Sequence, residues 1–498
     1  MRPNILFITA DQWRGDTLGA LGHAVKTPAL DRLAAEATLF ARHYATCAPC
    51  SPARASLYTG LYQMNHRVVW NGAGLDARFD NLALAARRAG YLPTLFGYTD
   101  TAPDPRHLAP RDPALSTYEG VLPGFSVRLN LDEAERPWVS WLGARGHDIS
   151  DPGAMHRVPP EEGERISRRP PVYSSEETQT AFLADAFLQW RAEQPADRPW
   201  FAHLSFLRPH PPFAVPEPYA SMYGEEEGPA FARHAGPDAE AAQHPFVAAI
   251  QGYQQLSDFV EGGAGRARDL APRDFARLRA LYHGLVSEVD AQLGRIFEAL
   301  RAAGAWENTV IVFTSDHGEM MGDHWMLGKG GFFPQSYHIP LIMRIPGRGA
   351  GRVEAFTSAA DIFPTLCDLM GVGPGHAPDG ASLAPFLDGQ APRRWRAAAL
   401  WEFDFRLLLG EDAARNGLAP EDCVLQCRMD GRHLYMASPG LPPALYDLGE
   451  DPDCLENRAA DPALAPVRLS QAEALLAERA RLMDRTLASR AVWDFYAG

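Results

Sequence analysis

Two short runs of apolar residues, far apart in the chain, have the pattern of buried strands. Residues 4–9 (NILFIT) and 308–315 (NTVIVFTS) are mostly apolar, without the alternation of a half-exposed strand. Such runs are typical of parallel strands whose sheet is covered by helices on both faces. The pattern therefore predicts an α/β fold with a doubly wound, mostly parallel sheet.

A helical pattern leads into the second of these strands. Val286, Val289, Leu293 and Leu300 recur at helical spacing, which places them on one apolar face of an amphipathic helix. A helix followed by a buried strand is the repeating unit of a doubly wound sheet. We find no internal sequence repeat.

Other stretches predict how the chain is divided. Residues 105–180 and 214–270 are rich in proline, glycine and charge and lack a clear period, so we expect insertions that cover the ligand crevice of the sheet and shape its pocket. The basic tract 389–396 (GQAPRRWR) marks a passage between domains. We place a catalytic domain at residues 1–390 and a smaller C-terminal domain at residues 391–498.

Composition limits the classes of function. The chain has 498 residues, 46% of them hydrophobic, and a net charge of -15, which argues against nucleic acid and anionic membranes as partners. If the substrate is an anion, a metal ion, arginine or lysine at the site must attract it despite the negative net charge of the chain. Six cysteines are too few for a disulfide scaffold, and no apolar run approaches the roughly 18 residues of a membrane span. The opening MRPNILFITADQ lacks a signal-peptide pattern, which predicts a cytoplasmic protein.

A short helix is predicted within residues 50–60 (CSPARASLYTG). Ser51 is a favourable N-cap before a proline, and Gly60 suits the position after the last turn. Cys50 would lie just before the helix N-terminus, where free N–H groups and the helix dipole favour an anion. Arg54, about one turn further on, is placed to fork onto anion oxygens.

This segment also has more ordinary interpretations. An isolated cysteine is commonly a small buried side chain, and an isolated arginine is usually solvated. Cys47 and Cys50 also form a CAPC string, whose spacing suits a redox or zinc pair. Proline and arginine follow Cys50 at the second and fourth positions, and this complete spacing favours a functional site at Cys50. Ser51 stands at the fourth position after Cys47, where an arginine would be needed. We therefore interpret Cys47 as a packing residue.

Polar residues follow both apolar runs. Asp11 and Gln12 come after the first run, and Asp316 and His317 come after the second. Side chains just past the carboxyl ends of strands line the ligand crevice of an open α/β sheet, so these four are placed to share one cation. Their oxygens and single imidazole suit Mn²⁺ or Ca²⁺ better than a thiolate-type zinc site. The alternative is that each pair caps a strand-to-helix turn.

The string from Cys50 to Gly60 resembles the signature of type I sulfatases, in which proline and arginine follow the cysteine at alternate positions and Thr-Gly comes later. The resemblance implies an alkaline phosphatase-like fold and oxidation of Cys50 to formylglycine by a formylglycine-generating enzyme. The hydrated aldehyde is the family's nucleophile towards sulfate or phosphate esters. The resemblance also implies one divalent metal ion held by Asp11, Gln12, Cys50, Asp316 and His317.

The ligand pairs indicate a branch of this family. Sulfatases usually have two aspartates after the first strand, whereas Asp11-Gln12 with Asp316-His317 is similar to the phosphonate monoester hydrolase and phosphodiesterase branch of the alkaline phosphatase superfamily. The similarity spans most of the chain. Further stretches that resemble this branch are HRVVWNG (66–72), GYTDTAPDPR (97–106), LRPHPP (207–212), LGKGGFF (327–333) and YHIPLIMR (337–344).

The C-terminal part resembles the smaller α+β domain of the same family. Residues around 424–435 and the segment 446–457 (YDLGEDPDCLEN) look like its antiparallel sheet. A closing helix is predicted over about residues 466–489. We expect it to pack on this sheet or on another subunit.

The substrate-binding residues implied by the resemblance are Asn71, Tyr98 and Asp100. Many sulfatases have G-K-x-H where this chain has residues 97–100 (GYTD), so a lysine and a histidine become Tyr98 and Asp100. Tyr98 resembles the tyrosine of the phosphonate monoester hydrolase branch. Asp100 stands where that branch has a neutral hydroxyl residue, unless Thr101 supplies the hydroxyl group. A carboxylate would repel a doubly charged phosphate and favour monoanionic diesters or phosphonate monoesters. Alternatively, Asp100 points away and caps a turn.

The catalytic residues implied by the resemblance are Cys50, Arg54, His210 and Lys329. Lys329 lies between glycines, where a flexible loop can bring its ammonium onto a non-bridging oxygen. His210 lies in a Pro-His-Pro-Pro context that restricts the backbone, and it is placed to donate a proton to the leaving group. Alone, such residues are normally just solvated. We interpret His324 as structural.

These parts predict a metal-dependent formylglycine hydrolase of phosphonate monoesters and phosphodiesters, with promiscuity towards sulfate esters. An arylsulfatase and a non-catalytic binding protein that retains the fold are the alternatives. We expect a small anionic ester as substrate, and neither nucleic acid nor membrane as partner. Analogy with the branch suggests a homo-oligomer, namely a tetramer.

Overall fold

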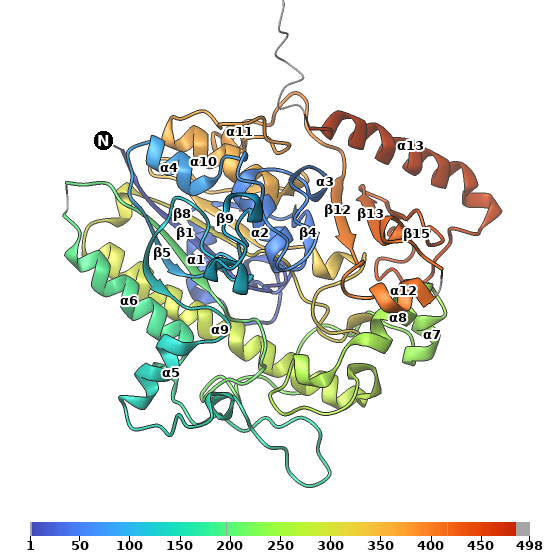
Figure 1. Ribbon diagram of the computed structural model, residues 1–498, viewed down its shortest axis with the longest axis horizontal. Helices are drawn as coiled ribbons and strands as arrows, with labels where there is room; N and C mark the ends of the chain where they lie inside the picture. The colour runs from blue at the N-terminus through green and yellow to red at the C-terminus, as the bar shows by residue number, and fades with distance from the viewer. Residues whose placement is uncertain (1, 196, 416, 485–498) are drawn as a thin grey trace, which may run out of the picture.

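The centre of the fold is an eight-stranded sheet with strand order β10-β2-β9-β8-β1-β7-β5-β6, in which β10 (Gly351–Val353) and β2 (Thr38–Phe40) form one edge. Figure 1 labels β1, β5, β8 and β9 of this sheet. This computed structural model describes residues 2–195, 197–415 and 417–484. Strand β9 (Leu341–Arg344) is antiparallel to its neighbours β8 and β2. The five strands from β8 to β6 are mutually parallel: β8 (Thr309–Thr314), β1 (Asn4–Ala10), β7 (Phe201–Phe206), β5 (Pro93–Gly97) and β6 (Ser126–Asn130). The predicted mostly parallel sheet is confirmed.

Strand β1 shows why the apolar runs are continuous. All seven of its residues are buried, because Ile5 and Phe7 belong to one hydrophobic core and Leu6 and Ile8 to a second core on the opposite face. Helix α9 in the second core includes the predicted amphipathic helix, and it leads into β8 as expected. The helices of the first core include α2 (Cys50–Thr59), α4 (Leu82–Arg88) and α10 (Ile362–Met370), and those of the second include α1 (Pro28–Ala35), α6 (Gln179–Glu193) and α9 (Pro272–Ala302).

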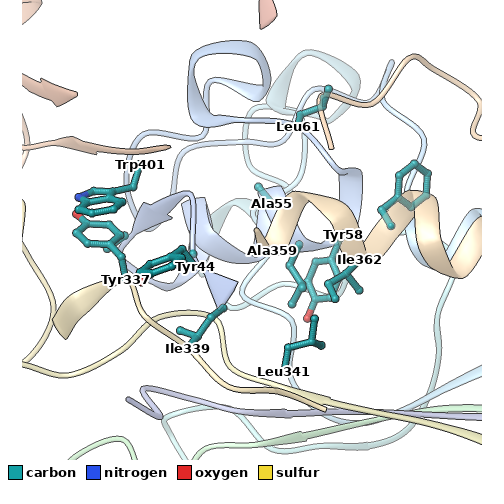
Figure 2. Close-up of a cluster of buried hydrophobic side chains, with 14 of the residues drawn as sticks. Tyr44, Ala55, Tyr58, Leu61, Tyr337, Ile339, Leu341, Ala359, Ile362 and Trp401 are labelled. Atoms are coloured by element: carbon teal, nitrogen blue, oxygen red, sulfur yellow. The ribbon is translucent and has the colours of Figure 1, made fainter. Parts of the chain in front are cut away.

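Helix α2 is held on the sheet by apolar packing. In Figure 2, Tyr58 lies beside Ile362 of α10, and both belong to the first core. On the other side of α2, the Trp401 ring stacks on Tyr337 at 5.0 Å and on Tyr44 at 6.0 Å between ring centroids. Because Trp401 belongs to strand β12 (Ala399–Asp404) of the C-terminal part, this packing joins that strand to the segments that precede α2 and β9.

The second sheet has five strands in the order β15-β14-β13-β12-β4. Four of them pair antiparallel, as the C-terminal resemblance predicts, whereas β4 (Cys47–Ala48) comes from the N-terminal part of the chain and adds in parallel to β12. The boundary at residue 390 stays a prediction. The antiparallel strands are β12 (Ala399–Asp404), β13 (Val424–Met429), β14 (His433–Ala437) and β15 (Ala444–Asp447).

Helix α13 (Ala465–Leu482) lies along the outer side of this sheet (Figure 1). It contacts β13 and β14, and Arg428 of β13 donates to Glu478 at 3.1 Å and to Gln471 at 2.6 Å. Packing of the closing helix on the sheet is therefore confirmed. Its expected end near residue 489 lies outside the described residues.

The prediction for residues 105–180 is partly wrong. This stretch contains β6, which is an edge strand of the central sheet, and helix α5 (Arg136–Gly143). The residues of β6 are half-buried or exposed, so this strand lacks the continuous apolar run of the inner strands. The second insertion carries two helices, α7 (Pro237–Ala241) and α8 (Pro245–Tyr253).

The pairing of the cysteines and the hydropathy of the helices can be read from the structure. All six cysteines are buried and free. Over the described ranges, no helix combines the length and the apolar character that are needed to traverse a lipid bilayer. The cytoplasmic location stays a prediction.

Candidate active site

Predicted site residues lie at the carboxyl ends of four parallel strands. Asp11 directly follows β1, and Asp316 lies two residues beyond β8, which pairs in parallel with β1. Tyr98 follows β5, and His210 lies on the loop after β7. Because parallel strands end at the same edge of the sheet, these distant segments meet there.

Four side chains form a buried cluster at this edge. Asp11, Cys50, Asp316 and His317 each offer one ligand atom, and these atoms all lie within 4.8 Å of one another. The Cys50 Sγ is 3.3 Å from His317 Nε2, which itself lies 3.7 Å from a carboxylate oxygen of Asp11 and of Asp316. Asp11, Cys50, Asp316 and His317 are therefore close enough to one another to share one cation.

The donor atoms of the cluster fit a divalent cation. His317 Nδ1 lies 3.1 Å from the Gly318 carbonyl, so Nδ1 donates there and the Nε2 lone pair faces the carboxylates. Asp11 Oδ1 is buried without a hydrogen-bond partner. Burial works to raise the pKa of Asp11, but Arg54, Lys329 and His317 keep it below its ordinary value, so the carboxylate is ionised. An ionised, unpartnered buried oxygen is what a metal ligand provides.

Gln12 lies beside the cluster in a left-handed backbone conformation, with φ of 65°. Its backbone N–H donates to Asp316 Oδ1 at 3.1 Å, and its Oε1 accepts from Lys329 Nζ at 2.8 Å. The Nε2 group donates to Glu319. Its role as a metal ligand stays a prediction, but these contacts already link it to Lys329.

Glu319 is a residue of the site that we did not predict. It is buried, and it accepts from Gln12 and from the backbone N–H groups of Met321 at 2.9 Å and Gly328 at 2.5 Å. Burial raises the pKa of Glu319, and these donors oppose the effect. Glu319 thus anchors both Gln12 and the loop that carries Lys329. A carboxylate two residues after His317 was the available clue.

The start of α2 differs from the prediction. The helix begins at Cys50, and Pro49 occupies the N-cap, so the assignment of Ser51 as N-cap is wrong. Asn71 supplies the missing acceptor from another segment, since its Oδ1 receives the Ser51 N–H at 3.0 Å. Gly60 ends the helix with φ of 72°, as predicted.

Arg54 is fully buried and contacts the carboxylates of the cluster. It donates to Asp316 Oδ2 and to Asp11 Oδ2, each at 3.0 Å, and to Ser205 Oγ at 3.0 Å. Its guanidinium lies 4.3 Å from the centre of the Tyr98 ring. These contacts orient two metal-ligand candidates. The predicted fork of Arg54 onto substrate oxygens stays a prediction.

Tyr98 and Asp100 both lie at the site. The Tyr98 hydroxyl donates to Asp11 Oδ2. Asp100 is 1% exposed, neither of its carboxylate oxygens has a hydrogen-bond partner, and the nearest cation is Arg54 Nε at 3.7 Å. Asp100 therefore does not cap a turn. Burial raises the pKa of Asp100 well above its usual range, and Arg54 opposes this effect.

The other two predicted catalytic residues are positioned by their neighbours. His210 Nδ1 lies 2.9 Å from the Pro211 carbonyl and donates to it, which leaves the Nε2 lone pair available. Burial, reinforced by Lys329, lowers the pKa of His210 well below its ordinary value, so the imidazole is neutral. Lys329 is held by Gln12.

His324 makes the contacts of a structural residue. Its Nδ1 lies 2.7 Å from a carboxylate oxygen of Glu240, and its ring stacks on Phe333 with centroids 3.5 Å apart. Both His324 and Glu240 are buried. These contacts fix the second insertion on the loop that leads to Lys329.

The fold and the site together define a protein of the alkaline phosphatase superfamily. A cation-binding cluster lies at the carboxyl edge of a doubly covered sheet, next to a cysteine at a helix N-terminus. Within that superfamily, the chain belongs to the sulfatase family, whose sequence profile matches residues 3–372. Residues 322–481 match a second profile, described as N-sulphoglucosamine sulphohydrolase, C-terminal.

Three relatives indicate how similarity is distributed within the superfamily. The crystal structure of the phosphonate monoester hydrolase of Agrobacterium radiobacter is 58% identical in sequence, with a TM-score of 0.95 and coverage of 98% of this chain and 97% of that one. The multifunctional alkaline phosphatase superfamily protein PehA of Trinickia caryophylli is 39% identical over 98% of this chain and 97% of its own length. An arylsulfatase of Clostridium perfringens is 26% identical, with coverage of 92% and 90%.

Proposed function

We propose that this chain hydrolyses monoanionic phosphorus esters, namely phosphonate monoesters and phosphodiesters, and that it also accepts sulfate esters. The observation that carries the proposal is the buried Asp11, Cys50, Asp316 and His317 cluster. The similarity to a phosphonate monoester hydrolase and to PehA, which exceeds that to the arylsulfatase, supports phosphorus esters as the main substrates.

The cofactor would be one divalent ion, Mn²⁺ or Ca²⁺, held by Asp11, Asp316 and His317 together with Gln12 and Cys50 oxidised to formylglycine. When bound, it supplies Lewis-acid activation of the nucleophile and of an ester oxygen. A formylglycine-generating enzyme would be the partner that modifies Cys50. A homo-oligomer, a tetramer by analogy with the branch, also stays a proposal.

The side chains of the site would divide the remaining tasks. Arg54 holds the carboxylates of Asp11 and Asp316 in place. Lys329 and the N-terminus of α2 stabilise negative charge on the non-bridging oxygens. His210 has its Nε2 free to exchange a proton with the leaving-group oxygen, and its lowered pKa would make the protonated imidazole a ready proton donor.

Asp100 would set the charge that the site accepts. Asp100 lies 3.7 Å from Arg54 and adds no positive charge, whether its carboxyl group is ionised or protonated, so the site lacks positive potential that a dianionic phosphate would require. We therefore expect kcat/KM for an aryl phosphodiester and an aryl phosphonate monoester to exceed that for the matched, dianionic aryl phosphate monoester by about tenfold or more. The matched aryl sulfate is also monoanionic, so a similar preference over it is expected from the higher identity to a phosphonate monoester hydrolase than to an arylsulfatase. The measurement uses one leaving group throughout, with modified, metal-loaded enzyme.

Other results would select an alternative function. A large preference for the sulfate ester would identify an arylsulfatase. If no ester is turned over, and intact mass and metal analysis show unmodified Cys50 and no bound cation, the chain is a non-catalytic binding protein.

A second prediction concerns the position of His210. Arg208 Nη1 donates to the His210 carbonyl at 2.6 Å and to the Pro212 carbonyl at 3.3 Å, and Nη2 lies 3.7 Å from a carboxylate oxygen of the buried Glu135. We expect Arg208→Met to lower kcat about tenfold, because the imidazole loses its fixed position. The pH profile of kcat should shift as well, which a general loss of stability would not cause.

The matched control for this prediction is Arg168→Met. Arg168 also donates to backbone carbonyls, those of Ala220 and Tyr223, but it does not touch the loop of His210. It should change stability without changing the pH profile. An unaltered profile and kcat in the Arg208 variant would contradict the positioning role.

A further inference from the structure

Acidic side chains border the proposed site on the side of β5 and β6. Glu133 follows β6 by three residues, and Glu119 lies in the preceding loop. That loop is fixed beside Asp100, since the Gly120 carbonyl accepts from Thr101 N at 3.0 Å and from Thr99 Oγ1 at 2.9 Å. We call Asp100, Glu119 and Glu133 the acidic rim.

Hydrogen bonds fix the positions of two carboxyl groups of the rim. The Tyr118 hydroxyl donates to Glu133 Oε2 at 2.8 Å, and the Glu133 backbone N–H donates to Glu119 Oε1 at 2.5 Å. Burial raises the pKa of Glu119 to about 7, and the neighbouring carboxylates of Glu133 and Asp132 reinforce the effect. The side chain of Glu133 is solvent-exposed, so an approaching ligand can reach it.

Asp100 supplies an independent indication of a ligand. It is only 1% exposed, yet both of its carboxylate oxygens lack a hydrogen-bond partner. The only ion-pair contact that reaches it within the described residues is Arg54, which also serves Asp11 and Asp316. A buried carboxylate normally receives N–H groups or a cation of its own. In its ionised form Asp100 therefore needs more positive charge than Arg54 alone provides, and a cationic group of a ligand would supply it.

The rim also faces the groups that would bind the reacting ester. Desolvation raises the pKa of Glu133, and the Lys329 ammonium opposes it, which places Glu133 within electrostatic range of Lys329. A side chain at Gly72, next to Asn71, would contact Tyr118 at 3.8 Å. The rim thus borders the Asn71 side of the site, whereas the leaving-group candidate His210 lies on the loop after β7.

We infer that the acidic rim is a subsite for a positively charged group on the retained organic arm of the ester. The preferred substrates would be zwitterionic, with a monoanionic phosphorus centre and an ammonium-type arm. Lys329 and the metal-ligand cluster would take the anionic end, and Glu133, Glu119 and Asp100 the cationic end. This inference rests on the proposed function, and it narrows the class of substrate.

The test compares two 4-nitrophenyl phosphodiesters that differ only in charge. One carries a trimethylammonioethyl arm, and the other carries the 3,3-dimethylbutyl arm, in which carbon replaces nitrogen. For the metal-loaded, modified enzyme, we expect kcat/KM for the cationic ester to be about tenfold higher at low ionic strength. This ratio should fall as salt is added, because Glu133 is exposed and screened.

Variants assign the preference to the rim. Glu133→Gln should bring the ratio close to one, whereas Glu162→Gln, which removes the same charge from an exposed residue of the same insertion, should preserve it. Tetramethylammonium should inhibit the wild-type enzyme competitively, a result that does not depend on folding of any variant.

Each remaining outcome counts against a specific statement. A ratio near one in the wild-type enzyme, with both esters turned over, would reject the subsite and leave the hydrolase proposal standing. A ratio that survives in Glu133→Gln would reject the assignment to the rim. Absence of turnover with both esters would reject the proposed function and, with it, the inference.

Discussion

Replacing Cys50 by alanine is expected to lower kcat about 10³-fold or more, because it removes the side chain from which the nucleophile would be made. Cys50 lies in the first turn of α2, with its Sγ 3.3 Å from His317 Nε2. The fold should tolerate the change, since loss of one small buried group costs about 1 kcal/mol of unfolding free energy. Steady-state kinetics and thermal unfolding of the purified variant measure the two effects.

Cys47 provides a matched control within the same segment. It is also fully buried, but its Sγ contacts Ser56 Oγ at 3.5 Å and Thr46 Oγ1 at 3.6 Å rather than the metal-ligand cluster. Cys47→Ala should therefore lose similar stability and retain turnover. A Cys50→Ala enzyme that keeps more than about a tenth of the wild-type kcat would exclude Cys50 as the nucleophile.

Removal of divalent ions by a chelator is expected to reduce turnover to background and to lower the melting temperature. Without a metal ion, the carboxylates of Asp11 and Asp316 share the ion pair with Arg54, and Asp11 Oδ1 has no hydrogen-bond partner. A ligand that binds only the folded state stabilises it by about 2.7 kcal/mol at a free concentration of 100 Kd. Mn²⁺ or Ca²⁺ should restore both the turnover and the melting temperature. Differential scanning calorimetry measures the melting temperature independently of activity.

The ligand assignment is tested by Asp316→Asn, which removes one charge from the cluster. The variant should require more metal for the same thermal shift, because it binds the cation less tightly. Asp290→Asn is the control, since Asp290 is also buried but accepts from Ala29 N and Leu30 N, outside the cluster. A chelated wild-type protein that is metal-free by elemental analysis and unchanged in melting temperature and rate would contradict the metal site.

Much of the fold follows from local sequence patterns. Residues 4–9 and 308–315 identify inner strands, because a strand with both faces covered must be apolar at nearly every position. Strand β6 escaped detection for the converse reason, since an edge strand does not need a continuous apolar run. The joining of β4 to the second sheet was also beyond prediction, as two residues carry no pattern of their own.

Parts of the site were predictable in the same way. Asp11 and Asp316 follow recognisable strands, and strands of a parallel sheet end at one edge, so their convergence could be expected. The start of α2 was mispredicted at Ser51 because the acceptor for its N–H is Asn71, a residue 20 positions away. Local capping rules do not include such tertiary partners.

The order of residue types along the chain was thus sufficient to indicate the sheet, the cysteine at the helix N-terminus and the identities of the metal-ligand candidates, because these depend on short-range periodicity and spacing. Only the packed structure decided that Arg54 contacts the carboxylates, that Glu319 anchors Gln12, and that Asp100 is left without a hydrogen bond. Hydrogen bonding and burial of these groups depend on segments distant in sequence, which come into contact only when the cores on both faces of the sheet are formed.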